Sequence, residues 1–566
     1  MSLQFITGNS GNGKTKYLFN RIVKEAKANP RDNYLVIVPE QFTMQTQRQL
    51  VDLSENKAIM NIDVLSFKRL AYRVFDELGI TNLTVLEETG KNLVLRKLAA
   101  QEADKLGVIG RNLNRIGYIS EVKSLLSELV QYNISPEELG RYIASGRLSD
   151  TLSDKLKDVL VLYEAFEKFM QDKYITAEEI LNELSNVAEE SAILRNSVIA
   201  FDEFTGFTPI QNQLIKKLFV ISKKIYVTLT IDCREDIFKS RGMQELFDMP
   251  KRTVKSLTEM AAFYGIEVEE PIILDKNYRL AENEELSFME QQLFRKRRGS
   301  FKKAPKHIHI DCLRDPKQEL TKIARRINEL VRNENLRYRD IAIVTGDVNI
   351  YAGYVREIFD KYNIPYFIDA TQEILFRPFI EFIRSIPDIA AQNFSADAVF
   401  RFLRCGFSEL LDSEIDVLEN YVLACGVRGK SAWDKKWVRL PKHKAGYDIE
   451  LLNQSREYIM ELLKPVYQVF SDKKSTVKDY VLAIYKLIVL LDIPDKLAKK
   501  EQALLDAGDQ TASKEYGQIY KIVMQLFEKY VAVLGDECMD AEEFTQILDA
   551  GLDAADVAVI PRDTTL

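Results

Sequence analysis

The sequence is poor in the residues that build metal centres and disulfide frameworks. It has three histidines, and its five cysteines are scattered along 566 residues with no CxxC pair among them. An odd, dispersed set of thiols is typical of reduced cysteines in a cytoplasm rather than of disulfides or a zinc site. We therefore expect a cytoplasmic protein without a histidine-based metal centre.

Long apolar runs and a dominant charge sign are also absent. No stretch approaches the ~18 consecutive apolar residues of a membrane span, and the first residues do not resemble a secretory signal. The net charge is −7, from 78 basic and 85 acidic residues. This balance excludes a uniformly basic surface, but it leaves room for a local positive channel that binds nucleic acid.

The hydrophobic pattern indicates an α/β protein. Residues 3–7 and 34–38 are expected strands, and the apolar face of 14–28 indicates a helix between them, which together make a βαβ unit. Helical periodicity follows from 87 to 190. Further expected strands lie at 197–201, 224–231, 307–313, 340–346 and 364–369, with a helix over 316–333 and a helical region after 378.

The glycine-rich loop, residues 8–15 (GNSGNGKT), fits the pattern GxxxxGK[ST] between an expected strand and an expected helix. In this context the backbone N–H groups wrap phosphates, Lys14 reaches the β- and γ-phosphates, and the Thr15 hydroxyl binds Mg²⁺. The alternative is a simple glycine-rich turn. The predicted nucleotide-binding residues of the loop are Gly8, Asn9, Ser10, Gly11, Asn12, Gly13, Lys14 and Thr15.

A carboxylate pair follows the expected strand at 197–201. Asp202 is placed to complete the Mg²⁺ shell, and Glu203 to position or activate water. The alternative for this pair is an acidic turn at the end of a strand.

Several motifs resemble those of UvrD-like helicases, in family order. Residues 202–211 (DEFTGFTPIQ) resemble DEFQDTNxxQ with the central Gln-Asp replaced, and 65–67 (LSF) resemble the HSF motif without its histidine. Residues 274–279 (LDKNYR) resemble LxxNYR, and 338–369 resemble the opening of a second RecA-like domain. Together with 38–47 (VPEQFTMQTQ) and 64–75 (VLSFKRLAYRVF), the set is most similar to the AddB family, of which RexB-type proteins are equivalents.

The resemblance implies a fold, domains and site residues. The fold is a P-loop NTPase with RecA-like parallel-sheet domains that carry large helical insertions. Arg279 would contact the γ-phosphate as a catalytic cation beside Glu203, and Gln211 would join the nucleotide site. The implied domains are a first RecA-like domain (1–86 and 191–290), a helical insertion (87–190), a partial second RecA-like domain (291–377) and a truncated helical insertion domain (378–566).

The resemblance also implies a function. Members of the family are B subunits of a bacterial ATP-dependent helicase/exonuclease that processes DNA double-strand breaks for recombinational repair. The implied cofactors are ATP and Mg²⁺. The implied partners are an AddA-type subunit in a heterodimer, double-stranded DNA ends and single-stranded DNA, with a contribution to hotspot recognition and no membrane.

Some family features are not found in the sequence. The upstream glutamine motif that reads adenine is absent, and so are the later helicase motifs, the nuclease region and the four clustered cysteines of an iron–sulfur cluster. We therefore expect an N-terminal fragment that is at most a weak ATPase, with the cluster present only in full-length members. The alternatives are an autonomous UvrD-like helicase and, less favoured by the motif spacing, a nucleotide-binding kinase.

Two basic segments are candidates for contact with DNA. Residues 294–306 hold seven cations and no acid, which suits either a DNA backbone contact or a solvated linker. Residues 427–447 combine Lys/Arg with both tryptophans, which suits single-stranded DNA, although Trp at i and i+4 more often forms a packing face. The named candidates are Arg297, Arg298, Lys302, Lys303, Trp433, Lys435, Lys436 and Trp437.

Overall fold

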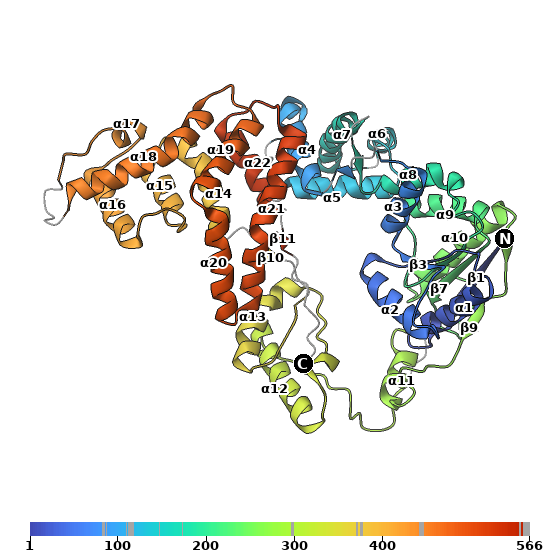
Figure 1. The fold of residues 1–566 in the computed structure, drawn as a ribbon. Coiled ribbons are helices and arrows are strands. Elements are labelled where there is room, and N and C mark those ends of the chain that lie inside the picture. The colour runs from blue at the N-terminus through green and yellow to red at the C-terminus, as the bar shows by residue number, and fades with distance from the viewer. Residues whose placement is uncertain are drawn as a thin grey trace. The chain divides into compact units, whose positions relative to one another are not determined.

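The computed structural model describes residues 1–81, 85–86, 88–108, 110, 118–146, 148–171, 174–295, 299–368, 372–373, 377–440, 447–553 and 556–557. The chain divides into two compact units, one of residues 1–86 and 124–310, the other of residues 87–123 and 311–566. The division cuts the expected helical insertion 87–190 at residue 123. Figure 1 shows both units as ribbons, and each is described by itself.

The first unit is built on a parallel sheet. Its strands run in the order β3-β2-β6-β7-β1-β8, β9 also pairs with β1, and every pair is parallel. A separate pair is formed by β4 and β5. The strands are β1 (Ser2–Gly8), β2 (Tyr34–Ile37), β3 (Ile62–Leu65), β4 (Val85–Leu86), β5 (Ile175–Thr176), β6 (Val198–Phe201), β7 (Lys224–Thr230), β8 (Glu267–Val268) and β9 (Ile272–Leu274).

Helices cover both faces of this sheet, which explains why β2 and β6 are buried and apolar at every position. On one face, α1 and α2 pack on Ile6, Val36 and Ala200; on the other, α3, α8, α9 and α10 pack on Phe5, Ile37 and their neighbours. The helices of this unit are α1 (Lys14–Ala28), α2 (Thr43–Leu53), α3 (Phe67–Leu78), α5 (Tyr118–Gln131) from residue 124 on, α6 (Pro136–Ala144), α7 (Asp150–Met170), α8 (Ile180–Val187), α9 (Pro209–Ile221), α10 (Asp248–Phe263) and α11 (Glu284–Gln292), with 3₁₀ turns η1 (Glu40–Phe42) and η4 (Ala188–Glu190).

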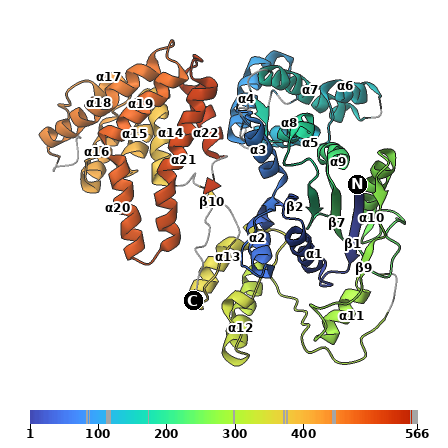
Figure 2. The same cartoon turned by 45° about the vertical axis from the view of Figure 1, so that its right-hand side comes forward.

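The second unit is mostly helical, and its core lies among α14–α16, α18, α19, α21 and α22. Figure 2 shows α20 and α21 side by side. The elements are α4 (Glu88–Gln101), η2 (Ala103–Lys105), the start of α5 (Tyr118–Gln131), α12 (Pro316–Asn333), η5 (Tyr338–Asp340), α13 (Val348–Lys361), β10 (Gln372–Glu373), α14 (Pro378–Ala391), α15 (Ala396–Leu403), α16 (Asp412–Cys425), α17 (Lys430–Trp433), α18 (Ile449–Ser471), α19 (Val477–Leu490), α20 (Ile493–Asp506), α21 (Gln510–Leu534), α22 (Ala541–Asp553) and β11 (Asp556–Val557).

The expected strands of the second α/β segment are wrong for this structure. The helix predicted over 316–333 is present as α12 and packs on α13, but 307–313, 340–346 and 364–368 form no strand. Residue 369 lies outside the described residues. Val344 is 93% exposed, although its run of apolar residues is typical of a buried strand. A strand needs a neighbour to pair its backbone groups, and none of the described strands pairs with these segments.

Within the described residues, no helix is both long enough and apolar enough to cross a membrane.

Candidate nucleotide site

The glycine-rich loop connects β1 to α1 at the carboxyl end of the sheet. Gly11 and Gly13 have φ of 87° and 79°, in the left-handed region that a side chain disfavours. A Cβ on Gly11 would lie 2.8 Å from both Arg279 Cβ and Asn277 Oδ1, so the position also lacks space for one. These two glycines allow the loop to turn tightly and to enter α1 directly.

The N-terminus of α1 is open to an anion. Its N-cap, Gly13, offers no side-chain oxygen, and no acidic residue stands in the first turn. The first N–H groups of a helix have no intrahelical acceptor, and the helix dipole places partial positive charge there. A phosphate is the kind of ligand that satisfies both features.

Neighbouring segments hold the loop from outside. Asn12 donates its side-chain N–H to the Leu274 carbonyl (2.6 Å), and Asn277 donates to the Ser10 carbonyl (2.9 Å). The backbone N–H groups of Tyr278 and Arg279 both lie within 3.3 Å of the Gly11 carbonyl. The 274–279 segment therefore lies against the loop.

Lys14 points back onto its own loop. Its ammonium donates to the Asn9 carbonyl at 3.0 Å. Burial lowers the pKa of Lys14, while the carboxylates of Glu203 and Asp202 oppose that shift. A lysine beside an open helix N-terminus suits recognition of the terminal phosphates of a nucleotide.

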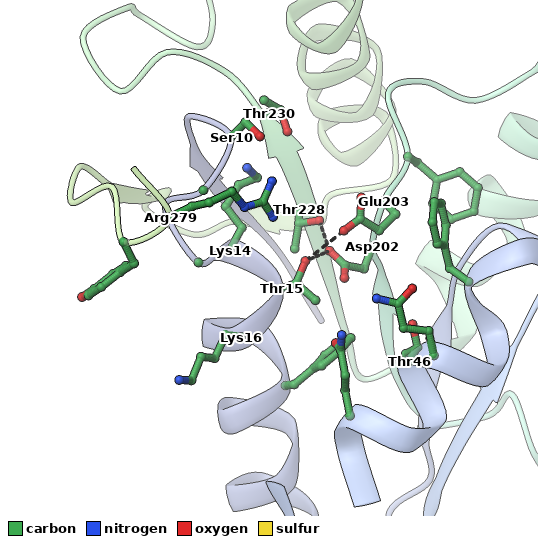
Figure 3. A pocket seen from close by; sticks show the side chains of 18 of the residues that line it. Ser10, Lys14, Thr15, Lys16, Thr46, Asp202, Glu203, Thr228, Thr230 and Arg279 are labelled. Carbon is green, nitrogen blue, oxygen red and sulfur yellow. Dashed lines mark hydrogen bonds between the residues drawn. The ribbon is translucent and has the colours of Figure 1, made fainter. Parts of the chain in front are cut away.

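Asp202, Glu203 and Thr15 meet at one corner of the cavity (Figure 3). The Thr15 hydroxyl lies 3.3 Å from Asp202 Oδ1 and 3.3 Å from Glu203 Oε1, and the Thr228 hydroxyl donates to Asp202 Oδ1. Asp202 Oδ2 is buried without a hydrogen-bond partner. Burial raises the pKa of Asp202 to about 6, against the hydrogen bonds from Thr228 and Thr15. Glu203 has φ of 64°, a strained conformation that aims its carboxylate at the cavity.

This corner fits Mg²⁺. The ion prefers oxygen ligands and keeps several waters, so one hydroxyl, one carboxylate and nucleotide phosphates suffice. The orphaned Oδ2 of Asp202 is an oxygen that a cation or its water shell would satisfy. Among the described residues, no group of three or more His, Cys, Asp or Glu side chains could hold a metal ion by itself.

The surrounding cavity has a volume of about 750 Å³ and lies within the first unit. It is lined by the loop, the Asp202–Thr205 turn, β7, the Tyr278–Arg279 pair and one face of α2. The wall formed by Phe42 of η1 and by Gln45, Thr46 and Gln49 of α2 was not anticipated as part of the site, and neither was Thr228. The segment containing α2 is similar to the family, but polar residues on a helix carry no local signal of a cavity.

Gln211 is placed elsewhere. It is absent from the cavity lining; its side chain accepts from the Thr208 N–H (2.9 Å), and its own N–H lies 3.4 Å from the Thr208 hydroxyl. This reciprocal pair is a capping box at the start of α9. Asn9 and Asn12 are buried and bond away from the cavity, so they contribute to the loop's shape rather than to its lining.

The candidate DNA-binding residues differ in their exposure to solvent. Trp433 and Trp437 are 0% and 6% exposed and pack on each other with ring centroids 5.2 Å apart. Base stacking on these rings does not fit their burial, and the packing alternative does. Lys435, Lys436 and Lys302 are exposed, and Lys303 pairs with Glu284 at 2.5 Å. Arg297 and Arg298 lie outside the described residues.

Comparison with known proteins agrees with the motifs. A sequence model of the family described as "ADDB, N-terminal" matches residues 5–290. The chain belongs to the AddB family. The match begins in β1 and ends in α11, so it contains the whole of the cavity described above.

Curated AddB relatives align along nearly the whole chain. The chain is 38% identical to a protein of Lachnoclostridium phytofermentans, over 99% of the chain and 50% of that protein. It is 32% identical to one of Caldanaerobacter subterraneus subsp. tengcongensis and 31% identical to one of Clostridium acetobutylicum, in each case over 99% of the chain and 49% of the relative. All three are named as the B subunit of an ATP-dependent helicase/deoxyribonuclease. The chain spans about half the length of these relatives.

Proposed function

We propose that this chain is the ATP-binding part of the B subunit of a bacterial, cytoplasmic ATP-dependent helicase/deoxyribonuclease that processes DNA double-strand breaks for recombinational repair. The observation that carries the proposal is the meeting of Lys14, Thr15, Asp202 and Glu203 around one cavity at the open N-terminus of α1. In this proposal the glycine-rich loop is a P-loop and the first unit is a RecA-like NTPase domain.

The residues take separate roles. Backbone N–H groups of the loop and the Lys14 ammonium bind the phosphates, and Arg279 stands beside the loop as a cation for the γ-phosphate. Thr15 and Asp202 would hold Mg²⁺, which neutralises phosphate charge when bound. Glu203 holds and deprotonates an attacking water, because its carboxylate faces the same cavity.

The relatives' names support the wider proposal. A protein named as a B subunit acts with another subunit, for which we propose an AddA-type helicase/nuclease, and the complex acts on double-stranded DNA ends and single-stranded DNA. A contribution to hotspot recognition belongs to the same proposal. An autonomous UvrD-like helicase is the competing function, and it is favoured only by the fact that Glu203 and Arg279 both reach the cavity.

The first test is the nucleotide affinity of Lys14→Ala. We expect ATP binding in Mg²⁺ to be lost, with the melting temperature unchanged within about 2 °C, because Lys14 contributes its charge to the cavity and little packing to the core. Isothermal titration and a thermal melt measure both quantities. Lys24→Ala, on the exposed side of the same helix, is the matched control and should bind normally. Unchanged ATP affinity in Lys14→Ala would rule out the P-loop assignment.

A further inference from the structure

Asn9 links the inside of the glycine-rich loop to α11. Its side chain is 4% exposed; Nδ2 donates to Glu290 Oε1 (2.8 Å), and Oδ1 accepts from the backbone N–H of Cys233 (2.9 Å). Its backbone carbonyl accepts from the Lys14 ammonium and from the Asn12 N–H. One residue therefore joins the resting position of Lys14 to a carboxylate 281 positions away in the chain.

Charged neighbours hold that carboxylate in place. Arg295 Nη2 donates to Glu290 Oε1 (3.3 Å), and Arg295 Nε donates to Asp232 Oδ2 (2.9 Å). The Arg295 side chain is 8% exposed and its guanidinium stacks on Phe247 at 4.5 Å. Asp232 is held in turn by three hydrogen bonds from Arg234, two from its guanidinium and one from its backbone N–H. Burial alone would raise the pKa of Asp232, but the bonds from Arg234 and Arg295 hold it well below its usual value.

The result is a satisfied network, Asn9–Glu290–Arg295–Asp232, behind the nucleotide cavity. Hydrogen bonds that involve ionised partners are the strong ones, and side chains joined by several such bonds are held rigidly. Neither Glu290 nor Arg295 lines the cavity, so neither can touch a bound phosphate in this arrangement. Position two of the GxxxxGK[ST] pattern accepts any residue, so the motif itself does not require Asn9.

We propose that Glu290, held by Arg295 and Asp232, is a positioning residue for nucleotide binding that acts through Asn9. This inference rests on the proposed nucleotide binding at the loop. By anchoring the Asn9 side chain, Glu290 sets the first peptide of the loop and the carbonyl on which Lys14 rests. Affinity for phosphates depends on such preorganisation, because a loop that must be ordered on binding loses part of the interaction free energy.

A donor–acceptor swap tests the link. In Asn9→Asp, a carboxylate faces the Glu290 carboxylate where an amide donated before, and ATP affinity should fall about 10-fold or more. In the double variant Asn9→Asp/Glu290→Gln, the new amide at 290 donates to the new carboxylate at 9, and the bond reforms with one negative charge, as in the native pair. Titration with Mg·ATP should show recovery to within about 3-fold of the native affinity.

The matched control is Asn9→Asp/Glu282→Gln. Glu282 is exposed, lies just before α11 and bonds to none of the loop residues, so its neutralisation changes net charge equally without restoring the bond. Recovery with Glu282→Gln as large as with Glu290→Gln, or undiminished affinity in Asn9→Asp, would overturn the proposal.

Glu290→Ala keeps the proposal testable should Asn9→Asp not fold. It removes the acceptor from a partly exposed position, and a variant that melts near the native temperature should bind ATP about 10-fold more weakly. Native affinity in this variant would contradict the positioning role. Failure of the native chain to bind ATP would instead count against the proposed function, so the two failures are distinguishable.

Discussion

Asp202 and Glu203 are adjacent in sequence but differ in environment. Asp202 is 1% exposed and shares a corner with Thr15 and Thr228, whereas Glu203 is exposed to the cavity on a left-handed backbone. A buried carboxylate with an unpaired oxygen costs stability whenever it is ionised. A carboxylate that lowers stability in this way is expected to serve cation binding rather than to stabilise the fold.

The cost predicts a pH-dependent gain of stability in Asp202→Asn. The pKa of Asp202 in the folded state is raised to about 6, above its unfolded value, so the stability of the native protein falls as pH rises from about 4 to about 6. An asparagine at this position does not ionise and therefore does not lose stability in this range. Without nucleotide or Mg²⁺, the variant should therefore be more stable by up to about 3 kcal/mol at pH 7.5, with a smaller difference at pH 5.

Urea unfolding at the two pH values measures this difference. Asp76→Asn, at an exposed position of α3, is the control and should change stability by less than about 0.5 kcal/mol at both. An Asp202→Asn variant that is less stable than the native protein at pH 7.5 would show that the carboxylate is structural.

At the scale of elements, α17 and the turn after it contain both a buried core residue and exposed charged residues. Trp433 is fully buried among Phe394, Phe400 and Trp437, while Lys435 and Lys436 are exposed on the same short segment. Two different variants therefore probe two different properties of one stretch of sequence.

Trp433→Ala should lower stability by about 3–5 kcal/mol, because it leaves a large cavity in the core. The double variant Lys435→Ala/Lys436→Ala should melt like the native protein. If these lysines touch phosphates, it should also bind single-stranded DNA more weakly, and the slope of log K against log[salt] should fall by about 1–2. Melting curves and fluorescence anisotropy at several salt concentrations measure both. An unchanged salt slope would remove this segment from the DNA-binding surface.

The segment 342–345, which follows η5 and pairs with no described strand, gives another element-scale prediction. Its amide hydrogens should exchange with solvent almost as fast as in an unfolded chain, because no strand pairs with it among the described residues. The amides of β2, which is paired on both sides, should be strongly protected. Hydrogen exchange followed by mass spectrometry compares the two; strong protection at 342–344 would mean that a sheet forms there in solution.

These elements show which features could be predicted from sequence. The strand–loop–helix of β1 and α1, the strands β6 and β7, and α12 follow from local periodicity and glycine placement, so they were predicted correctly. Within 340–346, residues 341–344 (IAIV) are continuously apolar like β2 (YLVI), but pairing depends on neighbours that composition does not specify.

The same distinction applies within the site. Thr15 and Asp202 were expected to meet because the motif carries that long-range contact with it. The contact of Asn9 with Glu290 has no local signal, since it joins residues 281 positions apart. Likewise, a tryptophan pair at i and i+4 indicates one shared face but not whether solvent or the core covers that face.

At the scale of the whole molecule, the rate of ATP hydrolysis depends on how many of the cations that stabilise the transition state one chain supplies. Among the described residues that line the cavity, Arg279 is the only arginine. In comparable phosphoryl-transfer sites, an arginine finger contributes about 10³–10⁵ in rate, and it stabilises the transition state more than the bound nucleotide. Binding therefore requires only the loop and the metal ligands, whereas fast hydrolysis requires a further cation.

We therefore predict that the isolated chain binds Mg·ATP but hydrolyses it slowly, on the order of 10⁻² s⁻¹ or less, and does not unwind duplex DNA alone. A steady-state ATPase assay with saturating single-stranded DNA measures the rate. Glu203→Gln is the control, because it should preserve binding while removing the carboxylate that faces the attacking water. Turnover of several per second that is abolished by Glu203→Gln would show that the chain completes its own catalytic site, and would favour the autonomous helicase over the subunit of a complex.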